Sequence, residues 1–217
     1  MMNRNAKKSM CGLLVTAILC GTVAVPLAGC SKKETTTTTT VEETTEAPTQ
    51  ASSETEESKE KAEPDIYVGQ YSAFDVSSDS LHDGFWDAAT SDTGSNKSLS
   101  PQLSWQPVDG ASCYVIYMVD LSANCFVHWK QGDITETTLP EGSAPRKNYI
   151  GPYPPAGSIH QYNIYVIALK NPVEKLTGSL RSICPDFSDV IKALDTDKDG
   201  NTGNILAAGT ISGKFKS

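Results

Sequence analysis

Apolar and polar residues alternate over several short segments in the second half of the chain. The alternation is clearest in residues 161–169, where large apolar and aromatic side chains recur at every second position. A period of two is typical of β-strands, and Gly, Pro and Asn-rich turns separate the segments. Short strands without long helices between them predict a sheet sandwich or barrel. The expected strands cover residues 66–76, 113–119, 125–134, 161–169 and 205–215.

One segment has helical spacing instead. Phe187, Val190, Ile191 and Leu194 recur along one face of a helix, and Asp186 precedes them as a candidate N-cap. We expect this helix to pack on the sheet.

The N-terminus has the layout of an export signal. Arg4, Lys7 and Lys8 precede an apolar run over residues 13–25, which is shorter than the ~20 residues that a transmembrane helix needs. The sequence Leu-Ala-Gly-Cys ends at Cys30 and resembles the lipobox of bacterial lipoproteins. This resemblance implies a signal peptide over residues 1–29 and a lipid on Cys30 that anchors the chain to the membrane. A plain secretory signal or an uncleaved anchor is the alternative.

Composition divides the rest of the chain into a linker and a domain. Residues 30–64 are rich in Thr and Glu, with Val41 as the only large apolar residue, so this segment is expected to be a disordered spacer. Residues 65–217 are long enough for one domain. The chain has 18 basic and 26 acidic residues, and all three basic residues of 1–30 would leave with the signal peptide. This acidic balance argues against nucleic acid as a partner.

Histidines are the first candidates for chemistry. The chain has three, and His128 and His160 lie beside aromatic residues in expected strands. An imidazole can bind an anion, ligate a metal or transfer a proton, but half-buried structural histidines explain the same pattern.

Four stretches match one known family in order and spacing. They are Ser-Leu-Ser-Pro-Gln-Leu-Ser-Trp at 98–105, Tyr-Met-Val-Asp at 117–120 followed by Phe-Val-His-Trp at 126–129, Tyr-Ile-Gly-Pro-Tyr-Pro-Pro-Ala-Gly-Ser-Ile-His-Gln-Tyr at 149–162, and Ala-Ala-Gly-Thr-Ile-Ser-Gly-Lys-Phe at 207–215. Together they resemble the phosphatidylethanolamine-binding proteins, which include the Raf kinase inhibitor proteins. The resemblance implies a mostly β, antiparallel β-sandwich, with one or two short helices near the C-terminus and a small pocket for phosphate-type anions. The matching ligand-binding residues are Asp120, His128, Pro154, Pro155, His160 and Tyr162.

The chain departs from that pattern in two places. The family's Asp-Pro-Asp-x-Pro loop is replaced by Asp120 followed by Leu-Ser-Ala-Asn, and the His-Arg pair is replaced by His160 and Gln161. Losing the arginine removes a fixed positive charge that can contact an anion. The pocket is therefore expected either to bind anions in an altered way or to be vestigial.

Two further features are weaker candidates. Residues 195–201 copy the start of a calcium loop, but Leu206 stands where a bidentate Glu belongs, so we interpret them as a solvated turn and expect no metal site. Cys113, Cys125 and Cys184 leave one thiol over if a disulfide forms, and the sequence leaves its pairing open.

The leading hypothesis is a non-enzymatic, cofactor-free binding protein of the bacterial cell envelope. It would recognise a small anionic or phosphorylated ligand through Asp120, His128, His160 and Tyr162. The alternative is a protein-interaction module that inhibits a kinase or protease and keeps a vestigial pocket. A hydrolase with His128 or His160 as general base ranks third, because the sequence offers no evident nucleophile or metal.

Overall fold

The computed structural model describes residues 64–94, 97–197 and 199–217. All the described residues belong to one compact unit. The expected signal peptide, Cys30 and the linker up to residue 63 lie outside the described residues. Among those described, no helix has the length and apolar character needed to cross a membrane.

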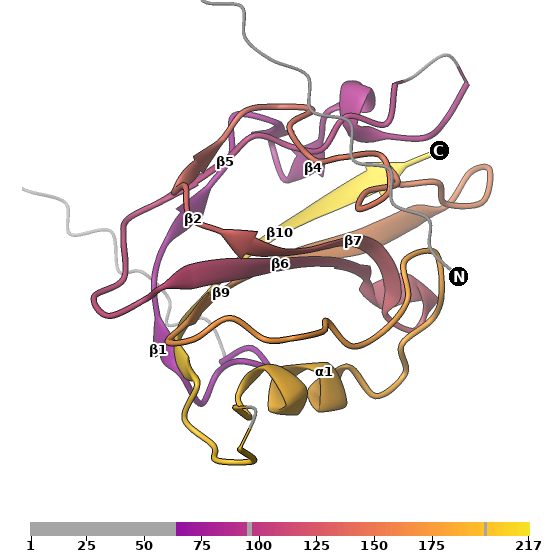
Figure 1. The fold of residues 1–217 in the computed structure, drawn as a ribbon. Helices are drawn as coiled ribbons and strands as arrows, with labels where there is room; N and C mark the ends of the chain where they lie inside the picture. Colours follow the sequence, from indigo (N-terminus) through magenta and orange to yellow (C-terminus); the bar gives the residue numbers. More distant parts are fainter. Residues whose placement is uncertain (1–63, 95–96, 198) are drawn as a thin grey trace, which may run out of the picture. The chain divides into compact units, whose positions relative to one another are not determined.

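Two sheets form the framework of the domain (Figure 1). The larger sheet has the order β3 (Leu81–His82), β4 (Phe85–Trp86), β10 (Ile205–Lys216), β9 (Ile159–Leu169), β6 (Cys113–Asp120) and β7 (Phe126–Ile134), with β1 (Ser72–Ala73) beside β10. Strands β10, β9, β6 and β7 are antiparallel neighbours, whereas the short β1 and β4 each pair parallel to β10. The smaller sheet has the order β2 (Val76–Ser77), β5 (Leu103–Trp105) and β8 (Thr138–Leu139). The expected mainly β fold is confirmed.

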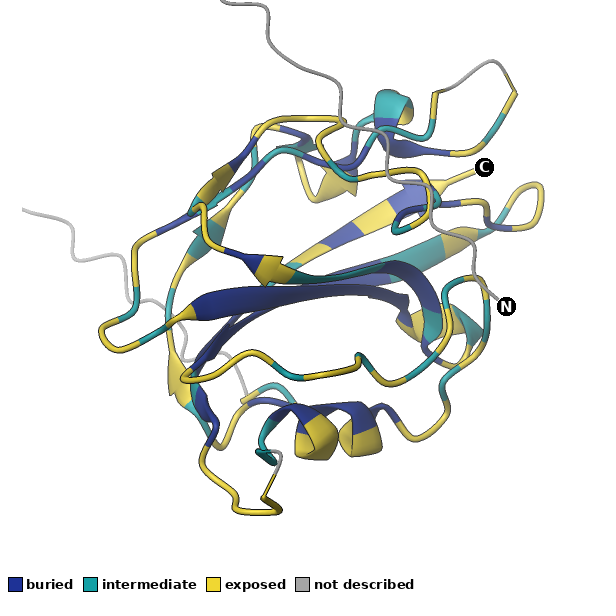
Figure 2. Ribbon diagram, viewed as in Figure 1, coloured by how far each residue is buried: buried dark blue, intermediate teal, exposed yellow. Residues whose placement is uncertain are grey.

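The central strands are covered on both faces. In β6, Val115, Tyr117 and Val119 belong to one apolar cluster, whereas Ile116 and Met118 belong to the other. The first cluster includes the helix, and the second includes residues of the smaller sheet. Figure 2 shows the result, with β6 and most of β9 buried along their length. Burial on both faces explains why these strands carry apolar residues at consecutive positions.

The expected helix is α1 (Phe187–Leu194), and its four apolar residues are buried as predicted. The cap prediction was wrong in part. Asp186 occupies the N-cap position, but its side chain accepts no capping hydrogen bond. Two short 3₁₀ helices, η1 (Ala88–Thr90) and η2 (Leu121–Ala123), complete the secondary structure of the described residues.

The strand expected over residues 66–76 was wrong over its first half. Residues 67–70 form turns, and only β1 and the start of β2 lie within the range. The cause is local, because the Asp65 carboxylate accepts hydrogen bonds from the amides of Tyr67 and Val68, and Gly69 donates to the Asp65 carbonyl. An Asp side chain that binds nearby amides favours a turn over an extended strand.

Candidate functional site

Three neighbouring strands of the larger sheet bring the predicted site residues together at one end. Asp120, the last residue of β6, lies opposite Tyr162 of β9 and Phe126 of β7. His160 lies two residues before Tyr162 in β9, so both side chains are on the same face of the strand. Strand register alone therefore places His160 and Tyr162 beside Asp120.

His128 reaches this group through an irregularity in β7. Met118 pairs with Trp129 and Val119 pairs with Val127, so His128 is an extra residue between the two pairs. A β-bulge of this kind re-aims a side chain. The His128 ring meets the Tyr162 ring edge-on, with 5.2 Å between ring centroids.

Asp120 uses both carboxylate oxygens within the protein. Its Oδ1 accepts hydrogen bonds from the amides of Ser122 (2.9 Å) and Ala123 (3.1 Å), which caps η2. Its Oδ2 accepts a hydrogen bond from Nδ1 of His160 at 2.6 Å. The Asp120 side chain is 5% exposed and that of His160 is 17% exposed. Asp120 therefore fixes the His160 ring, and Nε2 is the His160 nitrogen left for a ligand.

His128 is held differently. Its Nδ1 lies 3.0 Å from the Ile150 carbonyl oxygen and 3.2 Å from that of Gly151. Both partners are acceptors, so Nδ1 carries the proton and Nε2 is an acceptor in the neutral ring. Burial lowers the pKa of His128 and outweighs the opposing effects of these carbonyls and of the Asp120 charge. The ring is therefore neutral at pH 7.

Tyr162 carries a buried hydroxyl that has no hydrogen-bond partner in the described part of the chain. Burial first, and then the negative charge of Asp120, raise the pKa of Tyr162, so the hydroxyl stays protonated. The Asp120 carboxylate and the Tyr153 backbone lie close enough to the hydroxyl to influence its pKa, but neither is placed with the distance and angle of a hydrogen bond. Leaving such a group unpaired costs about 1–3 kcal/mol.

The two departures from the family pattern have visible structural replacements. The loop without prolines folds as η2, and Asp120 and the Ser122 hydroxyl tie it to β9, since the Gln161 amide donates to Ser122 Oγ at 2.9 Å. The Gln161 side chain donates to Asn163 Oδ1 at 3.3 Å and supplies no charge. Of the two expected wall residues, Pro154 is buried and Pro155 is exposed.

Neither the segment that resembles a calcium loop nor the three cysteines of the domain form a reactive or metal-binding group among the described residues. No group of three or more potential metal ligands exists among the described residues. Asp197 and Asp195 direct carboxylate oxygens at backbone amides, as expected of a turn. The three cysteines are free thiols, and burial raises the pKa of Cys113 and Cys184.

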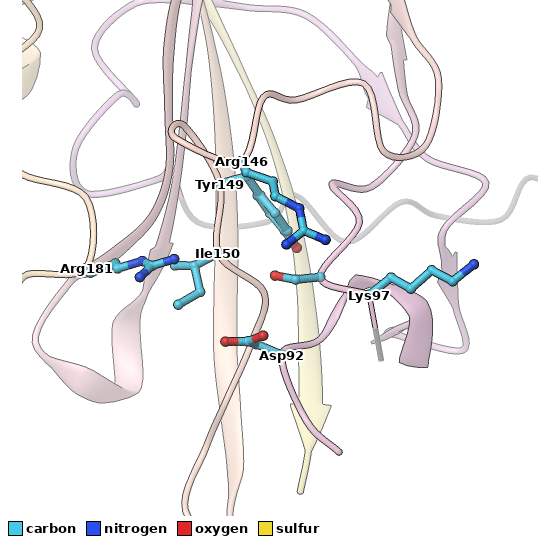
Figure 3. A pocket seen from close by; sticks show the side chains of 7 residues that line it. Asp92, Lys97, Arg146, Tyr149, Ile150 and Arg181 are labelled. Carbon is cyan, nitrogen blue, oxygen red and sulfur yellow. The ribbon is translucent and has the colours of Figure 1, made fainter. Parts of the chain in front are cut away.

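Sequence analysis missed a polar cavity of about 270 Å³ beside the His128 strand (Figure 3). Its lining comes from segments distant in sequence, and the only sequence signal is that Tyr149 and Ile150 directly precede the Gly-Pro motif. Asp92, Lys97, Ser98, Arg146, Tyr149, Ile150 and Arg181 line it.

Two solved structures are similar to this chain. A crystal structure of YbcL from Escherichia coli, described as a member of the mammalian PEBP family, superposes with a TM-score of 0.50 at 21% identity, covering 66% of this chain and 98% of that chain. A putative phosphatidylethanolamine-binding protein homologue from Chlamydia trachomatis gives a TM-score of 0.49 at 19% identity, covering 67% of this chain and 98% of that one. Among curated protein sequences no significant match is found.

At these identities the first likeness supports the fold, and the family itself rests on a separate match. Residues 77–216 match the family model described as phosphatidylethanolamine-binding protein. The match covers more than half of the chain and includes Asp120, His128, His160 and Tyr162. The chain belongs to the phosphatidylethanolamine-binding protein family.

Proposed function

We propose that this protein binds a small anionic or phosphorylated ligand, of the phosphate or phospholipid head group type, at the strand site. The strand site consists of Asp120, His128, His160 and Tyr162. The observation that carries the proposal is the buried Tyr162 hydroxyl, which lies near the Asp120 carboxylate but has no partner with hydrogen-bond geometry among the described residues. A ligand oxygen that accepts this proton would remove the cost of the unpaired group.

The other side chains divide the remaining contacts. A protonated His160 pairs with Asp120 through Nδ1 and has Nε2–H left to donate to an anion. A neutral His128 offers Nε2 as an acceptor for a ligand hydroxyl or ammonium group. An oxyanion that also carries a proton donor fits both roles, which describes a monoprotonated phosphate monoester.

Binding without catalysis is part of the proposal. Asp120 is already engaged with backbone amides and His160, and burial raises the pKa of the Cys113 and Cys184 thiols, which disfavours them as nucleophiles. A sustained turnover of phosphate or carboxylate esters that is lost in H160Q would contradict this part.

Export and lipid attachment at Cys30 form a separate part of the proposal. The basic, apolar and small-residue order of residues 1–30 supports it. Fractionation of the producing cells tests it: the wild type should stay with the membrane, and a Cys30→Ser variant should leave it, because lipid chains supply the attachment. Equal membrane retention of both proteins would contradict a lipid anchor.

Calorimetric titration with phosphoethanolamine, phosphate and acetate tests the ligand site. We expect saturable binding of the phosphorylated compounds, weakened about tenfold or more in H160Q and in Y162F, since each loses a hydrogen bond to a charged group. H82Q is the matched control, because His82 is exposed and pairs only with Asp87. No saturation at millimolar ligand would overturn the proposal and favour the protein-interaction alternative.

A further inference from the structure

We propose that the cavity in Figure 3 is a second binding site, for a small organic oxyanion, that works independently of the strand site. We name it the arginine pocket, lined by the residues given above. Its defining feature is that two arginines line it, Arg146 beside Tyr149 and Arg181 beside Ile150 (Figure 3).

The backbone on each side is fixed. Arg181 has a left-handed backbone conformation, with φ of 63°, which is uncommon for a residue other than glycine. Two hydrogen bonds hold it: the Arg181 amide donates to the Val127 carbonyl, and the Val127 amide donates to the Ser182 carbonyl, both at 2.9 Å. Strained conformations supported in this way concentrate at functional sites.

The turn that carries Arg146 is tied to the same strand. The Asn148 amide donates to the Pro145 carbonyl at 2.7 Å, closing a turn around Arg146. The Lys130 amide of β7 then donates to the Asn148 carbonyl at 2.9 Å. Both arginines therefore branch from segments hydrogen-bonded to β7, which fixes the distance between their backbones.

Charge distinguishes the arginine pocket from the rest of the chain. The whole chain has a formal net charge of −8, yet three of the seven lining residues are basic and one is acidic. Neither Arg146 nor Arg181 forms an ion pair with any described residue. Two unpaired arginines that line one cavity suit a carboxylate or phosphate, which each can grip with two parallel hydrogen bonds.

The cavity volume indicates more than a bare inorganic ion. About 270 Å³ equals roughly nine times the ~30 Å³ that one water occupies in the liquid. The Tyr149 and Ile150 side chains line part of the cavity, and Ile150 points into it in Figure 3. Carboxylates and phosphate esters with a short carbon skeleton combine a negative charge with an apolar part, and so they match this lining.

Asp92 gives the arginine pocket a polarity. Its carboxylate lies at the far end of the cavity from Arg146 (Figure 3), whereas the Lys97 side chain points away. A negative charge there repels a ligand that is anionic throughout and attracts one that carries an ammonium group. Asp92 therefore distinguishes oxyanions that also carry an ammonium group from oxyanions that are anionic throughout.

Titration of the H160Q/Y162F double variant tests the proposal, because the strand site is disabled in that background. Citrate and phosphoserine serve as probes in calorimetry at low salt. We expect saturable binding of each, weakened about tenfold or more by Arg146→Gln or Arg181→Gln. Adding Asp92→Asn should tighten the binding of citrate and weaken the binding of phosphoserine. Unchanged affinity for both probes would show that Asp92 does not face the ligand.

Matched variants separate contact from general attraction. Lys147→Gln removes one charge next to Arg146 without touching the lining, and we expect less than about a twofold effect on binding. Arg146→Lys keeps the charge but loses the two-pronged geometry, and we expect weakening of several-fold. Equal losses in Lys147→Gln and Arg146→Gln, or no saturation with either probe, would overturn the arginine pocket. A loss of phosphoethanolamine binding in the single variant H160Q concerns the strand site. It does not change the outcome for the arginine pocket.

Discussion

The strand site and the arginine pocket both contact the segment Ile150–Gly151 and are built in opposite ways. In the strand site, Asp120, His128 and Tyr162 are buried, and sheet register and backbone hydrogen bonds fix them. In the arginine pocket, Arg146 and Arg181 are exposed side chains on loops, and only their backbones are held.

This difference shows how one sheet supports two kinds of chemistry. Buried groups have fixed protonation and orientation, which suits recognition of a particular hydrogen-bond pattern. Exposed arginines keep their charge at all pH values and tolerate varied anions. The shared element is the segment at Ile150, whose amide donates to the His128 carbonyl at 2.8 Å and whose carbonyl accepts from the His128 ring.

Removing a carboxylate should have the largest effect on the free energy of unfolding. It should also distinguish the strand site from the arginine pocket most clearly. Asp120→Ala leaves two capping amides and the partly buried His160 ring without their acceptor, so we expect the free energy of unfolding to fall by about 3 kcal/mol. Asp92→Asn should change it by less than about 0.5 kcal/mol, because Asp92 is exposed. Denaturant unfolding measures both, and similar losses would contradict the distinction.

Disturbing the shared segment should have the next largest effect. A Cβ at Gly151 would overlap the Thr90 carbonyl oxygen and the Ser91 backbone, so Gly151→Ala should lower the unfolding free energy by about 1–3 kcal/mol. Gly132→Ala is the control, because its Cβ would meet only Leu176 at 3.4 Å. Thermal unfolding that ranks Gly132→Ala as the more damaging change would refute the tight contact at Gly151.

A smaller effect is expected from the orphan hydroxyl. Tyr162→Phe removes an unpaired buried donor, so we expect stability to stay equal or rise by up to about 1 kcal/mol. Tyr117→Phe should lower stability by about 1 kcal/mol, since the Tyr117 hydroxyl donates to the Thr177 carbonyl at 2.7 Å. If both substitutions cost the same in denaturant unfolding, Tyr162 already has an internal partner.

Titration of His128 should give the smallest effect, visible in the slope of stability with pH. Its lowered pKa means that the unfolded chain binds a proton at a pH where the folded protein does not. This contribution is complete above the unfolded pKa of about 6.5 and is lost as pH falls toward the folded pKa. His128→Gln should flatten the decline below about pH 6.5, whereas His82→Gln should keep it. An unchanged slope in His128→Gln would contradict the neutral buried ring.

Motifs shared with the family indicated Asp120, His128, His160 and Tyr162, and the structure brings these four residues together where β6, β7 and β9 meet. Strand alternation alone did not select them, because the strands expected at residues 113–119 and 161–169 exclude Asp120 and His160. The β-bulge at His128 and the capping of η2 depend on pairings between strands and carry no pattern of their own. The turn after Asp65 was missed because the Asp65 carboxylate accepts hydrogen bonds from the Tyr67 and Val68 amides and so reverses an otherwise strand-like sequence. The arginine pocket joins residues 92, 97–98, 146, 149–150 and 181, which only the folded sheet brings together.

The central claim is that the strand site binds a phosphorylated ligand through its two histidines. NMR of the His128 and His160 ring resonances, during titration with phosphoethanolamine and acetate in the Arg146→Gln/Arg181→Gln variant, tests it most directly. We predict saturable shifts at both rings with phosphoethanolamine and none with acetate. Shifts at neither ring with millimolar phosphoethanolamine would contradict the claim and leave the cluster as a structural element of the sheet.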